Sequence, residues 1–118
     1  MNPATTLPKT GLVRHHGGKY VSYHENGELE LTDSEESTFL FQDNFLCTKE
    51  GDKATLTVDG MKYTFQVDHP GGEFFAFKAV NEDGNHQDKL FLSANVTNLR
   101  LEPHEKSIEA FTILEKNE

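Results

Sequence analysis

The chain of 118 residues has no tryptophan, one cysteine and no long apolar run. A single cysteine, Cys47, allows neither an intramolecular disulfide nor a cysteine-based zinc site. Its apolar neighbours predict a small core residue, because free cysteine is among the most buried residue types. The longest apolar runs, such as residues 74–77, are far shorter than the roughly 20 residues that a membrane helix requires. We therefore expect neither a disulfide scaffold nor membrane insertion.

Basic residues are also scarce. The sequence has 11 Lys and Arg against 20 Asp and Glu, a formal net charge of −9, and the basic residues form no run. This balance argues against nucleic acid and anionic surfaces as partners, since binding to them relies on clustered Lys and Arg. The first ten residues contain neither an apolar stretch nor a basic leader, so we expect a cytoplasmic protein.

Helical periodicity is missing as well, and the pattern instead alternates between apolar and polar residues. Leu29 and Leu31 are typical of a half-buried strand, and Gly17-Gly18 and Asn26-Gly27 are strong turn signals. We expect a loop at Pro70-Gly71-Gly72 and another over 81–88. The predicted strands are twelve: 12–16, 19–24, 28–32, 38–42, 45–49, 54–58, 62–67, 73–77, 79–80, 90–94, 98–102 and 110–115.

One pattern occurs three times, at intervals of 35 and 36 residues. Its anchors are Val21-Ser22, Leu56-Thr57 and Leu92-Ser93, and each is preceded by a lysine and followed by an alternating apolar pair. A phenylalanine ends each copy, at 39, 75 and 111. A repeat of this length indicates units that cannot bury an apolar face alone and must share one core.

Twelve strands in three units predict an all-β fold of the β-trefoil type. Six strands would close a barrel and three hairpins would cap one end. We expect a single domain over 11–115, with tails at 1–10 and 116–118. A simpler up-and-down barrel or sandwich would explain the alternation but not the three-fold spacing. The predicted core is Leu12, Val21, Leu29, Leu31, Phe39, Phe41, Leu46, Leu56, Val58, Tyr63, Phe65, Phe75, Phe77, Leu90, Leu92, Leu99, Leu101, Phe111 and Ile113.

The first unit carries a resemblance. It contains His16-Gly17-Gly18-Lys19-Tyr20-Val21-Ser22, then Asn26-Gly27 and Leu29, which resembles the repeat of the fascin and hisactophilin type of β-trefoil. Residues 88–94 are a looser copy, whereas the middle unit has Ala54 in place of the aromatic residue. Fibroblast growth factors and interleukin-type cytokines share much of this pattern. The resemblance implies a β-trefoil and, through fascin and hisactophilin, a cytoskeletal, actin-type partner.

Six histidines are present, and His15-His16 is the only adjacent pair. Adjacent strand residues point to opposite faces, so we expect the pair to be exposed and unable to chelate one metal ion together. The other four, at 24, 69, 86 and 104, fall at separate positions. Zinc requires three or four converging ligands, and this spacing predicts none.

We expect no enzymatic site and no cofactor. No serine lies in a nucleophile-elbow sequence, and no glycine-rich phosphate loop opens a helix. The acidic segment 33–37 lacks the ligand spacing of an EF-hand, so we interpret it as a solvated loop.

The sequence therefore favours a non-catalytic binding module that presents surface loops to a protein partner. A carbohydrate-binding, lectin-like trefoil is an alternative, although the Gln-x-Trp signature of ricin-type lectins is absent and Tyr20 or Tyr23 would have to supply the stacking surface. Protease inhibition is a further alternative. The predicted binding site is the first hairpin, where cationic, imidazole and aromatic side chains gather around two glycines: Arg14, His15, His16, Lys19 and Tyr20.

Overall fold

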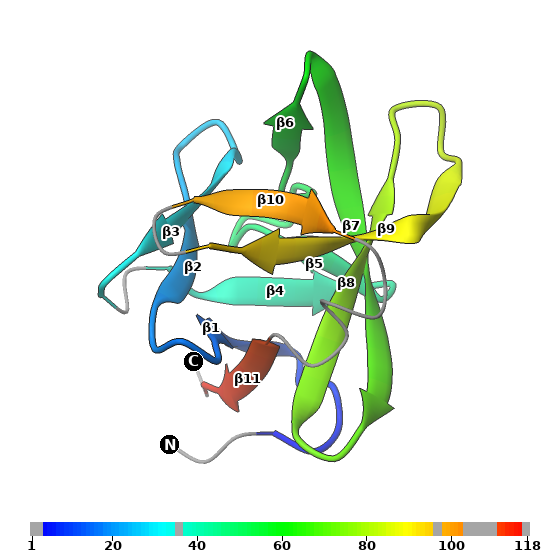
Figure 1. Ribbon diagram of the computed structural model, residues 1–118. Helices are drawn as coiled ribbons and strands as arrows, with labels where there is room; N and C mark the ends of the chain where they lie inside the picture. Colours follow the sequence, from blue (N-terminus) through cyan, green and yellow to red (C-terminus); the bar gives the residue numbers. More distant parts are fainter. Residues whose placement is uncertain (1–3, 35–36, 96–97, 103–110, 117–118) are drawn as a thin grey trace.

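The computed structural model describes residues 4–34, 37–95, 98–102 and 111–116. These residues form eleven strands and no helix, so the all-β prediction is confirmed (Figure 1). The described part of the chain has no helix of the length and apolarity needed to cross a membrane. The strands are β1 (Thr10–His15), β2 (Tyr20–Tyr23), β3 (Leu29–Thr32), β4 (Phe39–Gln42), β5 (Phe45–Cys47), β6 (Leu56–Val58), β7 (Met61–Gly71), β8 (Phe74–Val80), β9 (His86–Ala94), β10 (Leu99–Glu102) and β11 (Phe111–Glu115).

Six strands pair antiparallel in a closed ring. β1 pairs with β4, β4 with β5, β5 with β7, β7 with β8, β8 with β11, and β11 returns to β1. Closure removes the free strand edges that an open sheet would expose. Three further pairings form hairpins beyond the ring: β2 with β3, β6 with the first part of β7, and β9 with β10. In Figure 1 the β6–β7 hairpin projects upward, and β9 and β10 run side by side across the middle.

The number of strands differs from the prediction. The two strands expected at 73–77 and 79–80 are one continuous strand, β8, and β9 begins at residue 86, inside the expected polar loop. The loop expected at Pro70-Gly71-Gly72 is shorter and begins later, because β7 continues to Gly71 and the turn to β8 lies at 72–73. The ladder between β7 and β8 shifts register between Asp68 and Gly71. Such a shift accommodates Pro70, which has no N–H to donate to the ladder.

One turn geometry occurs four times among the described residues. In each case the first residue of the turn donates its N–H to the carbonyl of the fifth, and the fourth residue, a glycine, donates back to the carbonyl of the first. The glycine has a positive φ, between 83° and 102°, which side chains with a Cβ rarely adopt. A three-residue hairpin loop of this kind ends in a left-handed glycine. The four turns span His15–Lys19, His24–Glu28, Thr48–Asp52 and Asn81–Asn85.

The core lies inside the ring and under the hairpins. Six phenylalanines are fully buried, two of them in β8 and one each in β4, β7, β9 and β11. Fully burying a phenylalanine contributes roughly 1.5–3 kcal/mol, so these rings are a major source of stability. Most of the predicted core is buried, and Cys47 is buried as expected. Five predicted core residues are only half-buried: Leu31, Val58, Leu90, Leu99 and Leu101.

The core also contains residues that the alternation did not predict. Val13 and its neighbour Leu12 are both buried, and because successive strand residues point to opposite faces, β1 is covered on both faces. Two-sided burial removes the alternation on which the prediction relied. The additional buried apolar residues are Val13, Ala54, Ala76, Ala79, Val80, Phe91 and Leu114.

Candidate binding site

A cavity of about 390 Å³ opens at the turn between β1 and β2. Four of its lining residues come from the turn, His15, His16, Gly17 and Lys19, and two from the end of β9, Ala94 and Asn95. The volume falls in the range of small-molecule and side-chain binding pockets, roughly 300–1,000 Å³. Three of the five predicted site residues therefore lie around one cavity.

His15 is the buried wall of this cavity. It ends β1, only 9% of its surface is exposed, and its ring packs edge-on against Phe111 with centroids 5.4 Å apart. Its Nδ1 accepts a hydrogen bond from the Gly17 N–H at 3.2 Å. Burial, and secondarily the neighbouring His16, lowers the pKa of His15, so the imidazole is neutral at neutral pH. Because Nδ1 is the acceptor, the proton lies on Nε2. This Nε2–H makes no hydrogen bond to any other described residue.

His16 is exposed, and its ring centroid lies 4.3 Å from that of His15. The prediction that the two histidines point to opposite faces and are both exposed is therefore wrong. The reason is local: β1 ends at His15, and His16 already belongs to the turn, where the alternation of a pleated strand no longer applies. Among the described residues, no group of three or more His, Cys, Asp or Glu side chains is placed to hold a metal ion.

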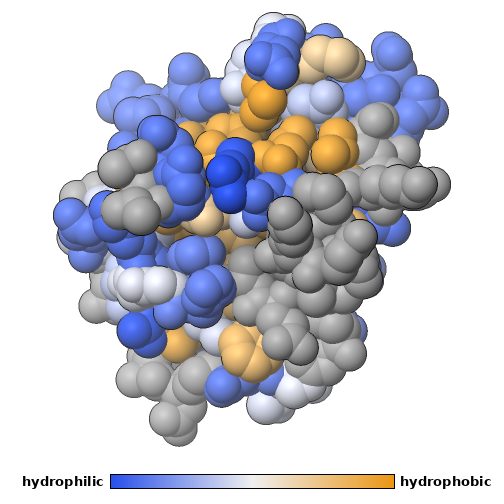
Figure 2. Space-filling view, viewed as in Figure 1, coloured by the Kyte–Doolittle hydropathy of each residue, from blue (hydrophilic) through white to orange (hydrophobic). Residues whose placement is uncertain are grey.

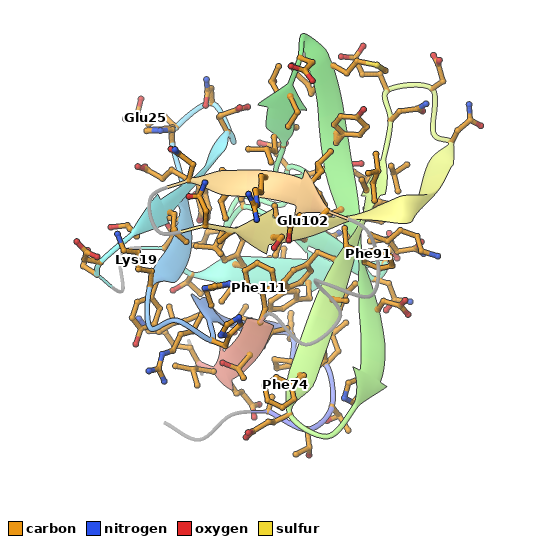
Figure 3. All side chains as sticks on the ribbon, in the orientation of Figure 1. Lys19, Glu25, Phe74, Phe91, Glu102 and Phe111 are labelled. Atoms are coloured by element: carbon orange, nitrogen blue, oxygen red, sulfur yellow. The ribbon has the colours of Figure 1, made fainter. Side chains whose placement is uncertain are left out.

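Lys19 supplies the positive charge at the cavity. Its side chain is 35% exposed, and its Nζ lies 3.4 Å from the Asp33 carboxylate, which is 86% exposed. An ion pair at this exposure contributes at most about 1 kcal/mol, so Asp33 is easily displaced by another anion. In Figure 3, Lys19 lies beside the first turn, and Glu25 marks the separate turn that follows β2.

Arg14 and Tyr20 do not line the cavity. They are opposite each other in the β1–β2 ladder, next to the buried pair formed by Val13 and Val21. Successive residues of a strand point to opposite faces, so Arg14 and Tyr20 lie on the face away from Val13 and His15. Of the predicted site residues, His15, His16 and Lys19 therefore line the cavity, whereas Arg14 and Tyr20 lie outside it.

The two β9 residues of the pocket were not predicted. Ala94 and Asn95 are about eighty residues away from the turn in sequence, and only closure of the fold brings them beside it. No local signal marks them as cavity residues, although Ala94 ends the looser copy of the repeat at 88–94. Tertiary proximity of this kind is not encoded in any single segment of the chain.

The other described histidines have separate surroundings. His24 Nε2 lies 3.4 Å from a Glu30 carboxylate oxygen. His69 stacks on Phe75, with ring centroids 4.5 Å apart, and its Nε2 lies 3.0 Å from the Gly72 carbonyl oxygen. The side chain of His86 and the whole of His104 are outside the described residues. His15 and His16 therefore share the cavity at the first turn, which neither His24 nor His69 lines.

Two other hollows differ in chemistry. One, of about 350 Å³, is lined mainly by leucines of β3, β6 and β10, and Figure 2 shows apolar atoms gathered at the base of the β6–β7 hairpin, above β10. The other is lined in part by Phe45, Lys53 and Glu82, and the Lys53 ammonium lies 4.0 Å from the centre of the Phe45 ring. Neither contains a histidine.

Comparison with family models, with curated proteins and with solved structures finds no match to this chain. The site is therefore interpreted from its own geometry.

Proposed function

We propose that the chain is a β-trefoil. The closed ring of six strands and the three hairpins beyond it support this interpretation, as does the recurrence of one turn at Gly18, Gly51 and Gly84, 33 residues apart. In this arrangement the long β7 acts as two consecutive trefoil strands, since its start pairs with β6 and its remainder with β8. Phe75 then lies in the first strand of the third unit, not in the last strand of the second.

We infer further that the protein is a non-catalytic binding module, and that the cavity at the first turn holds a group of a partner protein. The observation that carries this is the chemistry of the turn. The same turn forms at three other places, and each of those contains Asp or Glu. Residues 14–23 contain no Asp or Glu, but an arginine, two histidines and a lysine. The turn itself requires only its glycine, so the fold does not explain the imidazoles and the ammonium.

The partner that this surface favours presents acidic groups. A local excess of donors on a chain of net charge −9 makes the first turn the place where an anionic surface is attracted rather than repelled. The resemblance to fascin and hisactophilin makes an acidic cytoskeletal filament of the actin type the first candidate. Loops on a rigid scaffold are a common location of binding residues.

Paired variants test this proposal. His16→Ala with Lys19→Ala removes the two accessible polar side chains of the turn, whereas Glu50→Ala with Asp52→Ala changes the matching turn between β5 and β6. Co-sedimentation with actin filaments, and affinity capture of other partners, should lose binding in the first variant and keep it in the second. If the first variant retains wild-type affinity for every partner captured, the first turn is not the site.

His15 is left intact in that test. His15→Ala would also affect the fold, because His15 is buried against Phe111 and accepts the Gly17 hydrogen bond. Its removal would confound loss of binding with loss of structure.

A further inference from the structure

Two side chains of the cavity at the first turn, Lys19 and His15, offer hydrogen-bond donors. Lys19 has three N–H groups and no acceptor, and the neutral His15 imidazole has used its acceptor, Nδ1, on Gly17. What remains of His15 is one N–H at Nε2. A ligand that pairs with these two side chains must offer acceptors, and it must tolerate a partly apolar wall, which Ala94 and the edge of the imidazole provide.

From this lining we propose that the cavity binds a carboxylate, with one oxygen accepting from His15 Nε2–H and the other facing the Lys19 ammonium. This inference rests on the proposed function and names the chemical group that the partner would supply. A carboxylate is an acceptor-only group with one negative charge. It would take the place that the exposed Asp33 carboxylate occupies beside Lys19, at 3.4 Å.

The charge of the cavity favours a carboxylate over a phosphate. Among the described residues that line the cavity, Lys19 is the only lysine or arginine, and burial keeps His15 neutral at neutral pH. A phosphate of charge near −2 typically requires several full cations, often a bidentate arginine. Arg14, the nearest arginine in sequence, lies on the other face of the hairpin. A single positive charge matches a single negative one.

The turn holds His15 in the orientation that this role requires. At the equivalent turn between β8 and β9, the Asn81 side-chain oxygen accepts from the Asp83 N–H at 3.0 Å. His15 Nδ1 accepts from the Gly17 N–H in the same way, two residues ahead. Both side chains cap their turn, but only the imidazole has a second polar atom on the far side of its ring. The cap therefore fixes the tautomer and leaves Nε2–H for a ligand.

This equivalence supplies a matched variant. His15→Asn should preserve the cap, as Asn81 does, and delete the Nε2–H donor. Lys19→Gln removes the charge without touching the cap. Asn81→His is the reciprocal control, because it places an imidazole on a turn that carries Glu82 and Asp83 in place of cations.

The binding experiment uses the full chain at neutral pH, with nuclear magnetic resonance titration of the imidazole and amide signals. The probes are sodium propionate, an acetylated and amidated Gly-Glu-Gly peptide, an acetylated Gly-Gly-Gly peptide with a free carboxyl terminus, the Gly-Gln-Gly counterpart, inorganic phosphate and galactose. The first three distinguish a free small acid, an acidic side chain and a chain terminus as the source of the carboxylate. We expect saturable shifts at His15 and Lys19 with at least one of them, at an affinity in the millimolar range, and none with the glutamine peptide or galactose.

His15→Asn and Lys19→Gln should each weaken carboxylate binding roughly tenfold, the lower end of the effect of a charge-assisted hydrogen bond. Asn81→His should not add a second site. The proposal is overturned if no carboxylate probe saturates below roughly 50 mM, if phosphate binds more tightly, or if both site variants, shown to be folded by their amide spectra, bind as wild type. If the His16/Lys19 variant loses its partner but the wild-type chain binds no carboxylate probe, this inference is refuted and the proposed function is not. If the wild-type chain binds a carboxylate probe but its partner binds the His16/Lys19 variant as tightly as wild type, the proposed function is refuted and this inference is not.

Discussion

Tyr23 ties three parts of the molecule together, and removing its hydroxyl should be measurable. The hydroxyl donates to the Thr38 carbonyl at 2.9 Å, just before β4, and accepts from the Lys49 N–H at 2.9 Å, in the turn after β5. The ring packs edge-on against Phe39, with centroids 5.1 Å apart. Tyr23→Phe keeps the ring contact and deletes both hydrogen bonds, so its effect isolates the hydroxyl.

The two hydrogen bonds of the Tyr23 hydroxyl should contribute unequally to the free energy of unfolding. Thr38 is buried, so its carbonyl loses a partner where water has little access, whereas Lys49 is exposed and its N–H can turn to solvent. A net hydrogen bond contributes about 0.5–1.5 kcal/mol, with the upper end where a buried group is left without a partner. We therefore expect Tyr23→Phe to lower the free energy of unfolding by roughly 1.5–2.5 kcal/mol and Tm by roughly 5–10 °C.

Tyr20→Phe is the matched control, because Tyr20 lies at the other end of β2 and its hydroxyl makes no hydrogen bond to a described residue. Its free energy of unfolding should stay within about 0.5 kcal/mol of wild type. Urea titration, followed by circular dichroism, gives both values. If the two variants unfold at the same urea concentration, or if Tyr23→Phe loses less than about 0.5 kcal/mol, the hydroxyl does not hold the hairpin to its neighbours.

Three further changes have defined outcomes. Gly11→Ala would place a Cβ 2.8 Å from the Leu114 carbonyl oxygen, so β1 and β11 must separate, and thermal unfolding should show a loss of roughly 1–3 kcal/mol. Phe77→Ala empties a fully buried site and should cost roughly 3–5 kcal/mol in urea titration. The lowered pKa of His15 means that the unfolded chain binds a proton more readily, so stability should fall as pH drops through about 6.5. Between pH 7.5 and pH 5.5, roughly one unit either side of that value, the free energy of unfolding of His15→Asn should fall less than that of wild type. An equal fall in both proteins would contradict the burial of His15 as the cause.

The parts of the fold that the sequence predicted are those set by short-range rules. Alternating apolar residues and turn dipeptides placed β3, β4 and β10 within one residue of their observed bounds. The prediction was wrong where long-range pairing decides the local structure. β7 continues through Pro70 to Gly71, into the expected loop, because β8 pairs with it along that length. Val13 in β1 was missed for a related reason, since tertiary packing buries side chains on both faces of this strand.

The candidate site shows the same division. Composition around Gly17-Gly18 was enough to select the first hairpin, and His16 and Lys19 do line its cavity. The assumption that an adjacent pair alternates placed His15 on the surface, whereas the strand ends at that residue and the ring turns inward against Phe111. Burial is decided by the packing of β11, which lies about a hundred residues further along the chain and cannot be inferred from the hairpin sequence.

The four matching turns separate what the fold requires from what a ligand would require. Each has a glycine with positive φ at its fourth position and the same pair of backbone hydrogen bonds. The first position must only cap or fill its turn, and asparagine, threonine and histidine all occur there. Asparagine serves this purpose at position 81 with a shorter side chain. A histidine at position 15 is therefore more than the turn needs. Its additional polar atom is Nε2, on a side chain that lines the cavity together with Lys19. If His15→Asn proves as stable as the wild-type chain at neutral pH, the imidazole contributes nothing to the fold that an amide does not, and its presence must be explained by binding.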